Sequence, residues 1–248
     1  MQGWQIFIHS LRMVIDNLGA ALRISAVLYA VQVVVNTYFN MTFGSQLVSV
    51  AAGNQMGVTG GFLMALLLNL LVTIIVSLWI AVAWHRYVLL EETPDAAIPK
   101  FEGGLIAAYF WKSFLLGLMV GLISIVLMMV IGPLVGGEGT LWAQALVGIP
   151  ALYVFYRFCL VLPAAALGES CSFSESFEKT KSAASALVFL AAIAAATAFL
   201  VQLPSILNTD PASVVNQIYT HVLGWIVMMG GVSILTTLYG VYYEGRRL

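Results

Sequence analysis

The chain has 248 residues and a formal net charge of −1, with 61% hydrophobic and only 8% charged residues. Soluble proteins average about 25% charged residues, so this composition is typical of a protein that lies in lipid. The few basic residues are scattered along a chain that carries almost no net charge, which argues against nucleic acid as a partner.

The chain begins with a segment that repeats apolar residues at helical spacing. Gln5, His9, Arg12 and Asp16 are predicted to lie opposite an apolar face. That face consists of Trp4, Phe7, Ile8, Leu11, Val14, Ile15 and Leu18. The pattern predicts an amphipathic helix lying in the headgroup plane. There is neither a basic stretch before the apolar part nor a small-residue cleavage site after it, so we expect the segment to remain on the mature protein.

Six later stretches are long and apolar enough to cross a bilayer, which takes about 20 residues of helix. They are residues 24–43, 62–84, 113–134, 141–162, 185–207 and 222–243. Each is expected to be a helix, because a continuous apolar run in lipid has to satisfy its own backbone hydrogen bonds. The sequence therefore predicts an all-α, polytopic protein with six transmembrane helices and both termini on one side.

The basic residues predict which side that is. The loops on the opposite side, 44–61, 135–140 and 208–221, contain no Lys or Arg. The side that holds the termini carries Arg12, Arg23, Arg86, Lys100, Lys112, Lys179, Lys181, Arg246 and Arg247. By the positive-inside rule both termini are expected in the cytoplasm. We expect a multi-pass protein of the bacterial inner membrane, with amphipathic cytoplasmic segments at 1–23, 91–112 and 168–184.

The same order of segments occurs three times along the chain. Residues 1–248 are expected to form a single transmembrane domain, within which 1–84, 85–168 and 169–248 each hold a polar segment followed by a pair of spans. The second and fourth spans also end in a similar order of Arg, aromatic and Leu residues. This pattern suggests a threefold repeat of helical hairpins in parallel orientation.

Four residues are candidates for function or for contact with lipid headgroups: Arg157, Arg86, His85 and Pro150. Arg157 is the only basic residue inside a predicted span, where a charge is costly and often functional. The interpretation that we favour is that Arg157 extends to lipid phosphates, as Arg86 would; the alternative is a buried, functional arginine. His85 is expected at the cytoplasmic boundary. Pro150 either marks a broken helix at a transport site or kinks a packed helix.

No catalytic residues or cofactor ligands are predicted. The three histidines are expected at membrane boundaries on opposite sides, and Cys159 and Cys171 have neither redox nor zinc spacing. The acidic residues of the loop after residue 90 have no nucleophile or phosphate-binding motif beside them. We therefore expect no metal, haem or other cofactor.

Two sets of small residues predict close helix packing. One is Gly117-x-x-x-Gly121 in the third span. The other is an alanine run in the fifth span, made of Ala191, Ala192, Ala194, Ala195, Ala196 and Ala198. Small side chains let helix backbones approach closely in lipid. These faces are expected to join neighbouring spans or another protein.

The segment Arg-Phe-Cys-Leu-Val-Leu-Pro-Ala-Ala-Ala-Leu-Gly-Glu at 157–169, followed by Ser-Glu-Ser-Phe-Glu-Lys-Thr-Lys at 174–181, resembles a group of six-span bacterial inner-membrane proteins. The group includes YciC-type proteins and the membrane domain attached to some glycerophosphodiester phosphodiesterases. Residues 17–25 and 84–90 also look like alphaproteobacterial relatives of it. The chain departs from the pattern at Phe177 and Glu178, where small residues are common. The resemblance implies a six-span architecture and no particular activity.

Three functions follow as hypotheses, of which an intramembrane enzyme is the least favoured because no acid, base or metal-binding groups cluster at one depth. The first is a non-enzymatic accessory, scaffold or assembly subunit of a larger membrane complex, with membrane lipids and another membrane protein as partners. The alternative is a small transporter or lipid-handling protein, in which a cavity would converge on Arg157 and Pro150.

Overall fold

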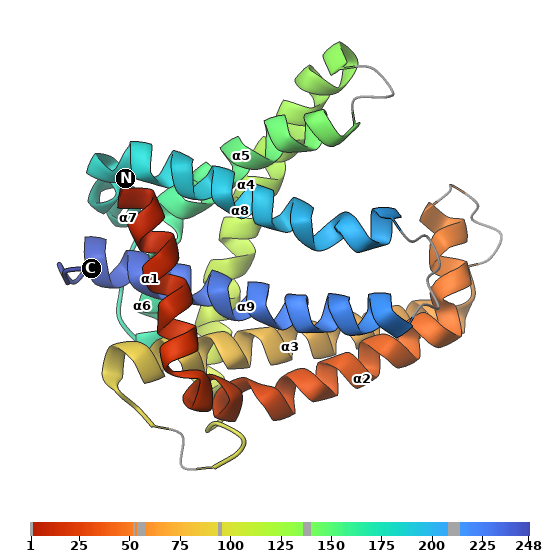
Figure 1. Ribbon diagram of the computed structural model, residues 1–248, viewed down its shortest axis with the longest axis horizontal. Coiled ribbons are helices and arrows are strands. Elements are labelled where there is room, and N and C mark those ends of the chain that lie inside the picture. Colours follow the sequence, from red (N-terminus) through yellow and green to blue (C-terminus); the bar gives the residue numbers. More distant parts are fainter. Residues whose placement is uncertain (1, 52, 54–57, 94–95, 136–139, 208–213) are drawn as a thin grey trace.

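The computed structural model describes residues 2–51, 53, 58–93, 96–135, 140–207 and 214–248 (Figure 1). Every regular element in these ranges is a helix, which confirms the predicted all-α class. In chain order the helices are α1 (Gln2–Asp16), α2 (Leu18–Ala51), α3 (Gly60–Leu90), α4 (Gly103–Val135), α5 (Thr140–Phe158), α6 (Val161–Leu167), α7 (Phe173–Lys179), the 3-10 helix η2 (Lys181–Ala183), α8 (Ala184–Leu207) and α9 (Val214–Tyr242).

Five of the described helices, α2, α3, α4, α8 and α9, are long and apolar enough to cross a membrane. A sixth crossing is possible because α5 and α6 pass the same test together, as one span bent by 41°. The chain is thus built as a multi-pass membrane protein, as the sequence predicts.

The fourth span differs from its prediction in shape. The prediction places one continuous span over residues 141–162, whereas the helix breaks after Phe158 and restarts as α6. Pro163 lies in the first turn of α6, where its missing N–H has no intrahelical partner to lose. Gly168 then ends α6 at φ +78°, a left-handed conformation that favours glycine.

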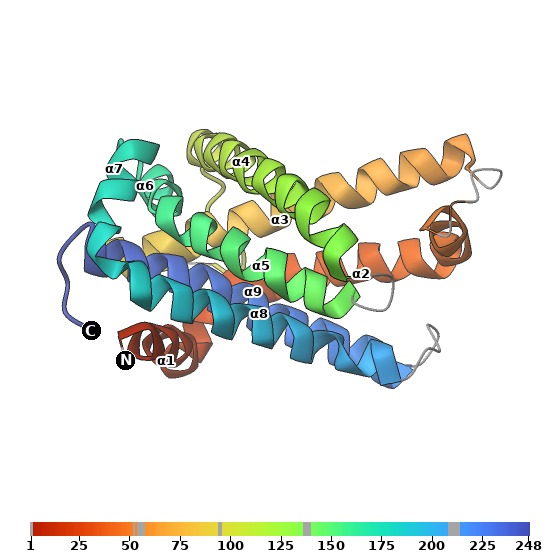
Figure 2. The ribbon, with the colours of Figure 1, turned by 90° about the horizontal axis from the view of Figure 1, so that it is seen from above.

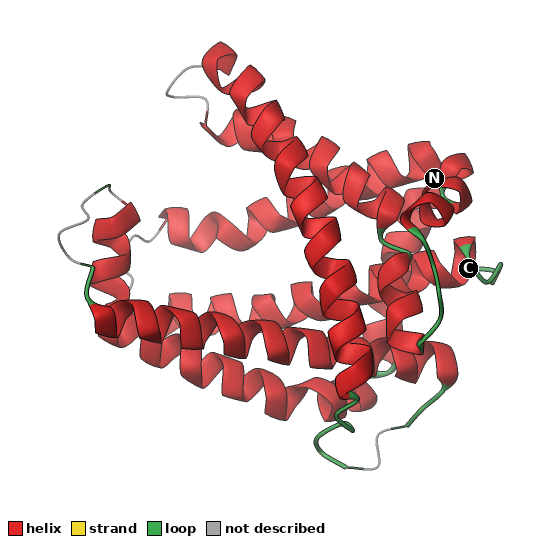
Figure 3. Ribbon diagram, turned by 180° about the vertical axis from the view of Figure 1, so that it is seen from behind, coloured by secondary structure: helices red, strands yellow, loops and turns green. Residues whose placement is uncertain are grey.

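The helices pack as two tight pairs and one open pair. Helix α2 lies along α3, and α4 lies along α5. Helix α8 packs mainly on α5, and α9 mainly on α1 and α3, so these two last helices contact each other less. Both termini lie at one end of the bundle, and the helices diverge toward the other end (Figures 1 and 3). The threefold repeat remains a prediction.

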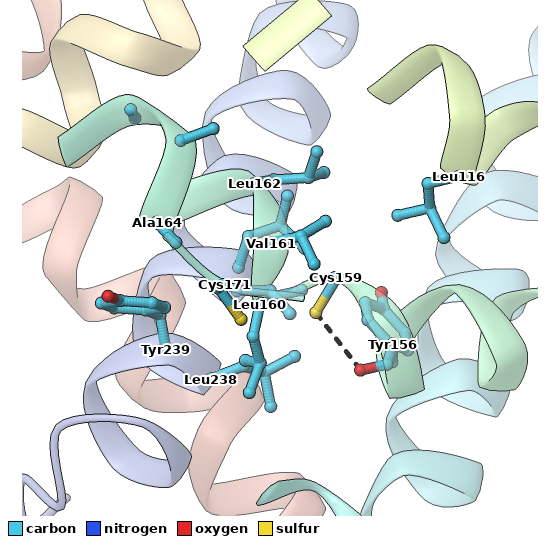
Figure 4. Packing of buried hydrophobic residues seen from close by; sticks show 14 of the residues in the cluster. Leu116, Tyr156, Cys159, Leu160, Val161, Leu162, Ala164, Cys171, Leu238 and Tyr239 are labelled. Carbon is cyan, nitrogen blue, oxygen red and sulfur yellow. Dashed lines mark hydrogen bonds between the residues drawn. The ribbon is translucent and has the colours of Figure 1, made fainter. Parts of the chain in front are cut away.

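The core lies at the end that holds the termini. The larger cluster surrounds the bend between α5 and α6, with Leu116, Leu160 and Leu238 fully buried within it (Figure 4). A second cluster joins α2, α3 and α9 around Ile80 and Trp84. Toward the divergent ends, large apolar side chains such as Met41 and Met129 are exposed, as lipid-facing residues are.

Helix α1 forms as predicted and crosses α8 and α9 near the termini (Figure 1). Of the predicted apolar face only Val14 is buried, and the other buried residues of α1 lie outside that face. Gly3, Ile6 and Ser10 are fully or almost fully buried, whereas Trp4 and Ile15 remain 50% and 66% exposed. A small side chain is required at the crossing, because a Cβ atom on Gly3 would lie 2.4 Å from the carbonyl oxygen of Ala186.

We predict that Gly3→Ala destabilises the protein, because backbone would have to move to admit the methyl group. The loss should be about 1–3 kcal/mol, as in other overpacked sites, and would be seen as a lower Tm in detergent. Gly19→Ala is the matched control, since Gly19 is also the second residue of its helix and its Cβ would meet nothing within 4 Å. Equal melting temperatures for the two variants would contradict the crossing.

Candidate functional site

Arg157 lies inside the protein at the end of α5, and only 4% of its surface is exposed. Its guanidinium donates hydrogen bonds to the carbonyl oxygens of Thr180 (3.1 Å) and Phe177 (2.9 Å). These carbonyls end α7, where a positive charge is favoured by the helix dipole. The guanidinium carbon also lies 4.0 Å from the centroid of the Phe177 ring, in a cation–π contact.

Side chains of α7 and of Thr180, which follows it, bind backbone groups that the bend between α5 and α6 leaves without helical partners. The hydroxyls of Ser176 and Thr180 both donate to the carbonyl oxygen of Arg157, each at 3.0 Å. The Ser176 hydroxyl also accepts the N–H of Leu160 at 3.3 Å. We call this set of reciprocal bonds the α7 clamp. It corrects the favoured interpretation of the sequence, because Arg157 binds protein carbonyls and does not extend to lipid phosphates.

The α7 clamp includes the aromatic ring of Phe177, which covers one face of the Arg157 guanidinium. A small residue there would leave the face of the guanidinium without a ring to contact. The aromatic side chain is therefore matched to Arg157, twenty residues earlier in the chain.

His85 is also inside the protein, fully buried where α3 passes between α4 and α9. Its Nδ1 lies 2.8 Å from the hydroxyl of Thr236, and its Nε2 lies 3.2 Å from the hydroxyl of Tyr109. His85 therefore bonds to protein groups, and its expected depth at the cytoplasmic boundary stays a prediction. Residue 85 is one turn from the end of α3, but it lies on the face that packs against other helices.

Sequence reasoning missed the row of hydroxyls on α9, one of which is the Thr236 hydroxyl that bonds to His85. Ser233 accepts the indole N–H of Trp84 at 2.9 Å, and Thr237 accepts the hydroxyl of Ser10 at 2.9 Å. Positions 233, 236 and 237 have the spacing of one helix face. That spacing, inside an otherwise apolar span, was the signal available in the sequence.

Helix α9 is also hydrogen-bonded to α2, nearer to the end of the bundle at which the helices diverge. Trp225 donates its indole N–H to Ser25 at 2.7 Å, and Tyr29 donates to the carbonyl oxygen of His221 at 2.7 Å. A Cβ on Gly224 would lie 2.8 Å from the Tyr29 hydroxyl, so this contact depends on glycine. Hydrogen bonds across helices thus tie α9 to α1, α2 and α3.

Arg86 faces away from His85, toward a cavity of about 760 Å³ between the start of α2, the end of α3 and the loop that follows α3. Its guanidinium makes a two-pronged ion pair with Glu92 and donates to the carbonyl oxygen of Ala166 at 3.3 Å. The side chain is 19% exposed. Of the four residues predicted from the sequence, Arg86 is the one that lines this cavity.

The part of the lining loop that leads into α4 is held against α3. Trp79 donates its indole N–H to the carbonyl oxygen of Lys100 at 3.3 Å and contacts the ring of Phe101 edge-on at 4.8 Å. Lys100 pairs with Glu102 and, by donating a hydrogen bond to it, lowers the pKa of that carboxyl. The lowered pKa favours the charged carboxylate of Glu102.

Pro150 lies on an exposed part of α5 and lines no part of the cavity. Arg157 does not line it either. The structure thus keeps the predicted candidates apart: two lie in hydrogen-bonded protein interiors, one lines the cavity and one faces outward. Among the residues that the structure describes, no three His, Cys, Asp or Glu side chains are grouped to hold a metal.

No protein-family model, curated protein or solved structure matches the chain. The resemblance to six-span inner-membrane proteins therefore remains a prediction from the quoted segments.

We predict that Thr180→Val destabilises the protein, because the isosteric side chain lacks the hydroxyl that binds the Arg157 carbonyl. The expected loss is about 1–3 kcal/mol, the cost of leaving a buried polar group poorly satisfied. Thr180→Ser keeps the hydroxyl and should retain most of the stability. Thermal unfolding in detergent would compare the two; a valine variant as stable as the serine variant would refute the α7 clamp as a stabilising element.

Proposed function

We propose that this chain is a non-enzymatic accessory subunit of a larger assembly in the bacterial inner membrane, with both termini in the cytoplasm. The observation that supports the role is the open face of α4. Helix α4 lies along one outer side of the bundle (Figure 2). A Cβ built on either Gly117 or Gly121 would meet nothing within 4 Å.

The open face is surrounded by exposed apolar side chains. Phe114 and Ile125, one turn before Gly117 and one turn after Gly121, are 49% and 53% exposed. Because lipid supplies no hydrophobic drive for helix association, membrane helices associate through close packing at small residues. The geometry of α4 suits a transmembrane helix of a partner protein.

The alanine run of α8 provides a comparison within the chain. Ala191 is fully buried, and Ala194 packs against the core. That small-residue face is used inside the subunit, whereas the glycine face of α4 contacts no other described helix closely. The transporter or lipid-handling alternative is less favoured, because Arg157 and Pro150 do not converge on the cavity.

We predict that the double substitution Gly117→Leu and Gly121→Leu abolishes co-purification of a partner from native membranes in mild detergent. The added side chains would hold the partner's backbone away while meeting nothing in this chain. The control is Leu115→Phe with Leu122→Phe, which adds bulk on the opposite exposed face of α4. Recovery of the unaltered protein as a lone monomer would overturn the proposal.

A second prediction tests the proposed orientation. Burial raises the pKa of the Cys171 thiol to about 11, and Cys159 is fully buried, so the native cysteines should react slowly. Ser174→Cys and Ser45→Cys place exposed thiols at opposite ends of the bundle. An impermeant thiol reagent applied to intact cells should modify the cysteine at 45 and leave that at 174 unmodified. The reverse result would refute cytoplasmic termini.

A further inference from the structure

We propose that the cavity beside Arg86 binds the headgroup of a zwitterionic phospholipid that carries a primary ammonium group. This inference goes beyond the accessory role and does not depend on it, because the cavity and the open face of α4 involve different residues.

The cavity is amphiphilic, as a site for the upper part of a lipid must be. Its apolar lining includes Ala83 of α3 and the exposed Ile98 of the following loop, together with the buried Ile24 and Val82. Arg86 and the charged residues of the following loop line the rest. The cavity lies at the end of a membrane-spanning helix, which is where headgroups meet protein. Acyl chains would continue from the apolar wall into the bilayer.

The balance of charge favours a lipid that carries both signs. Among the residues that the structure describes, two cations (Arg86 and Lys100) and three carboxylates (Glu91, Glu92 and Glu102) line the cavity, so these groups carry a formal charge of 2 − 3 = −1. A lipid with a net negative headgroup would meet a net negative site. A zwitterionic lipid can place its phosphate near the cations and its ammonium near the carboxylates. Lys100 can turn toward a phosphate, since its side chain is 84% exposed.

Glu91 is the carboxylate best suited to the ammonium. Glu92 is engaged by Arg86, and Glu102 by Lys100. Glu91 makes no ion pair within the described part of the chain, although it lines the same cavity. Its carboxylate is therefore available, and an ammonium group offers three donors for charge-assisted hydrogen bonds.

The backbone of Glu91 gives an independent reason to assign it a role. At φ +57° it is the one non-glycine residue among those described that adopts the left-handed conformation. It ends α3 at a position where glycine would carry no steric cost. A strained residue whose side chain lines a cavity is a candidate for function.

The test uses the full-length protein purified in detergent, with lipid binding measured by native mass spectrometry. The probes are phosphatidylethanolamine and phosphatidylglycerol with identical acyl chains. The first should bind more tightly. Glu91→Gly and Glu91→Asn both tolerate the left-handed conformation and remove the charge. Each should weaken phosphatidylethanolamine about tenfold, the effect of losing one charge-assisted contact, with no loss of thermal stability in lipid-free detergent.

Two further variants complete the test. Lys100→Gln should weaken phosphatidylethanolamine binding without affecting folding, because the side chain is almost fully exposed. Glu178→Gln is the control, because this exposed carboxylate pairs with Lys181 outside the cavity; it should bind lipid as the unaltered protein does. Arg86 is unsuitable for substitution, since it also holds Glu92 and the Ala166 carbonyl.

Three results would overturn the proposal. The first is equal or tighter binding of phosphatidylglycerol by the unaltered protein. The second is unchanged affinity in both Glu91 variants. The third is competition by soluble phosphoethanolamine at the same concentration as the lipid, which would identify a free metabolite and not a membrane lipid as the ligand. None of these results bears on partner association through α4.

Discussion

The bend between α5 and α6 is the feature on which the rest of the bundle depends. Inside a membrane a broken helix exposes backbone groups that lipid cannot satisfy, at a cost of several kcal/mol for each. The α7 clamp supplies the missing partners: two hydroxyls for the Arg157 carbonyl, and the Arg157 guanidinium for the carbonyls that end α7. The largest apolar cluster surrounds this bend (Figure 4). Helix α7 leads through η2 into α8, which receives the crossing of α1 at Gly3.

Helix α9 is joined to α1, α2 and α3 by hydrogen bonds between side chains or from a side chain to the backbone. Lipid surrounds apolar side chains as well as protein does, so burial alone holds membrane helices together weakly. Hydrogen bonds from α1, α2 and α3 to α9 supply specificity instead, through Ser10, Tyr29 and Trp84. His85 joins α9 to α4 through Thr236 and Tyr109. The bonds of Ser10, Trp84 and His85 lie toward the end of the bundle that holds the termini, where the core is packed.

The two surfaces with proposed roles differ in chemistry as well as in position. The face of α4 around Gly117 and Gly121 is apolar and flat, which suits another helix. The cavity at Arg86 carries both signs of charge above an apolar wall, which suits the boundary between headgroups and acyl chains. A subunit that binds lipid at its charged end and a partner along its side would couple an assembly to its surrounding membrane. Neither surface uses the α7 clamp or the hydroxyls of α9, so stability and binding can be altered separately.

The sequence alone determined the helical class, the membrane-spanning segments and the existence of the amphipathic α1, because these follow from composition and local periodicity. Only the tertiary structure decided which groups Arg157 and His85 bind, which residues of α1 are buried against α8 and α9, and where a cavity forms. The physical reason is that hydropathy measures transfer out of water, and lipid and protein interior are both apolar destinations. An apolar span therefore does not reveal which of its faces meets protein. A polar residue within it, such as His85, finds its partners on helices far away in the chain.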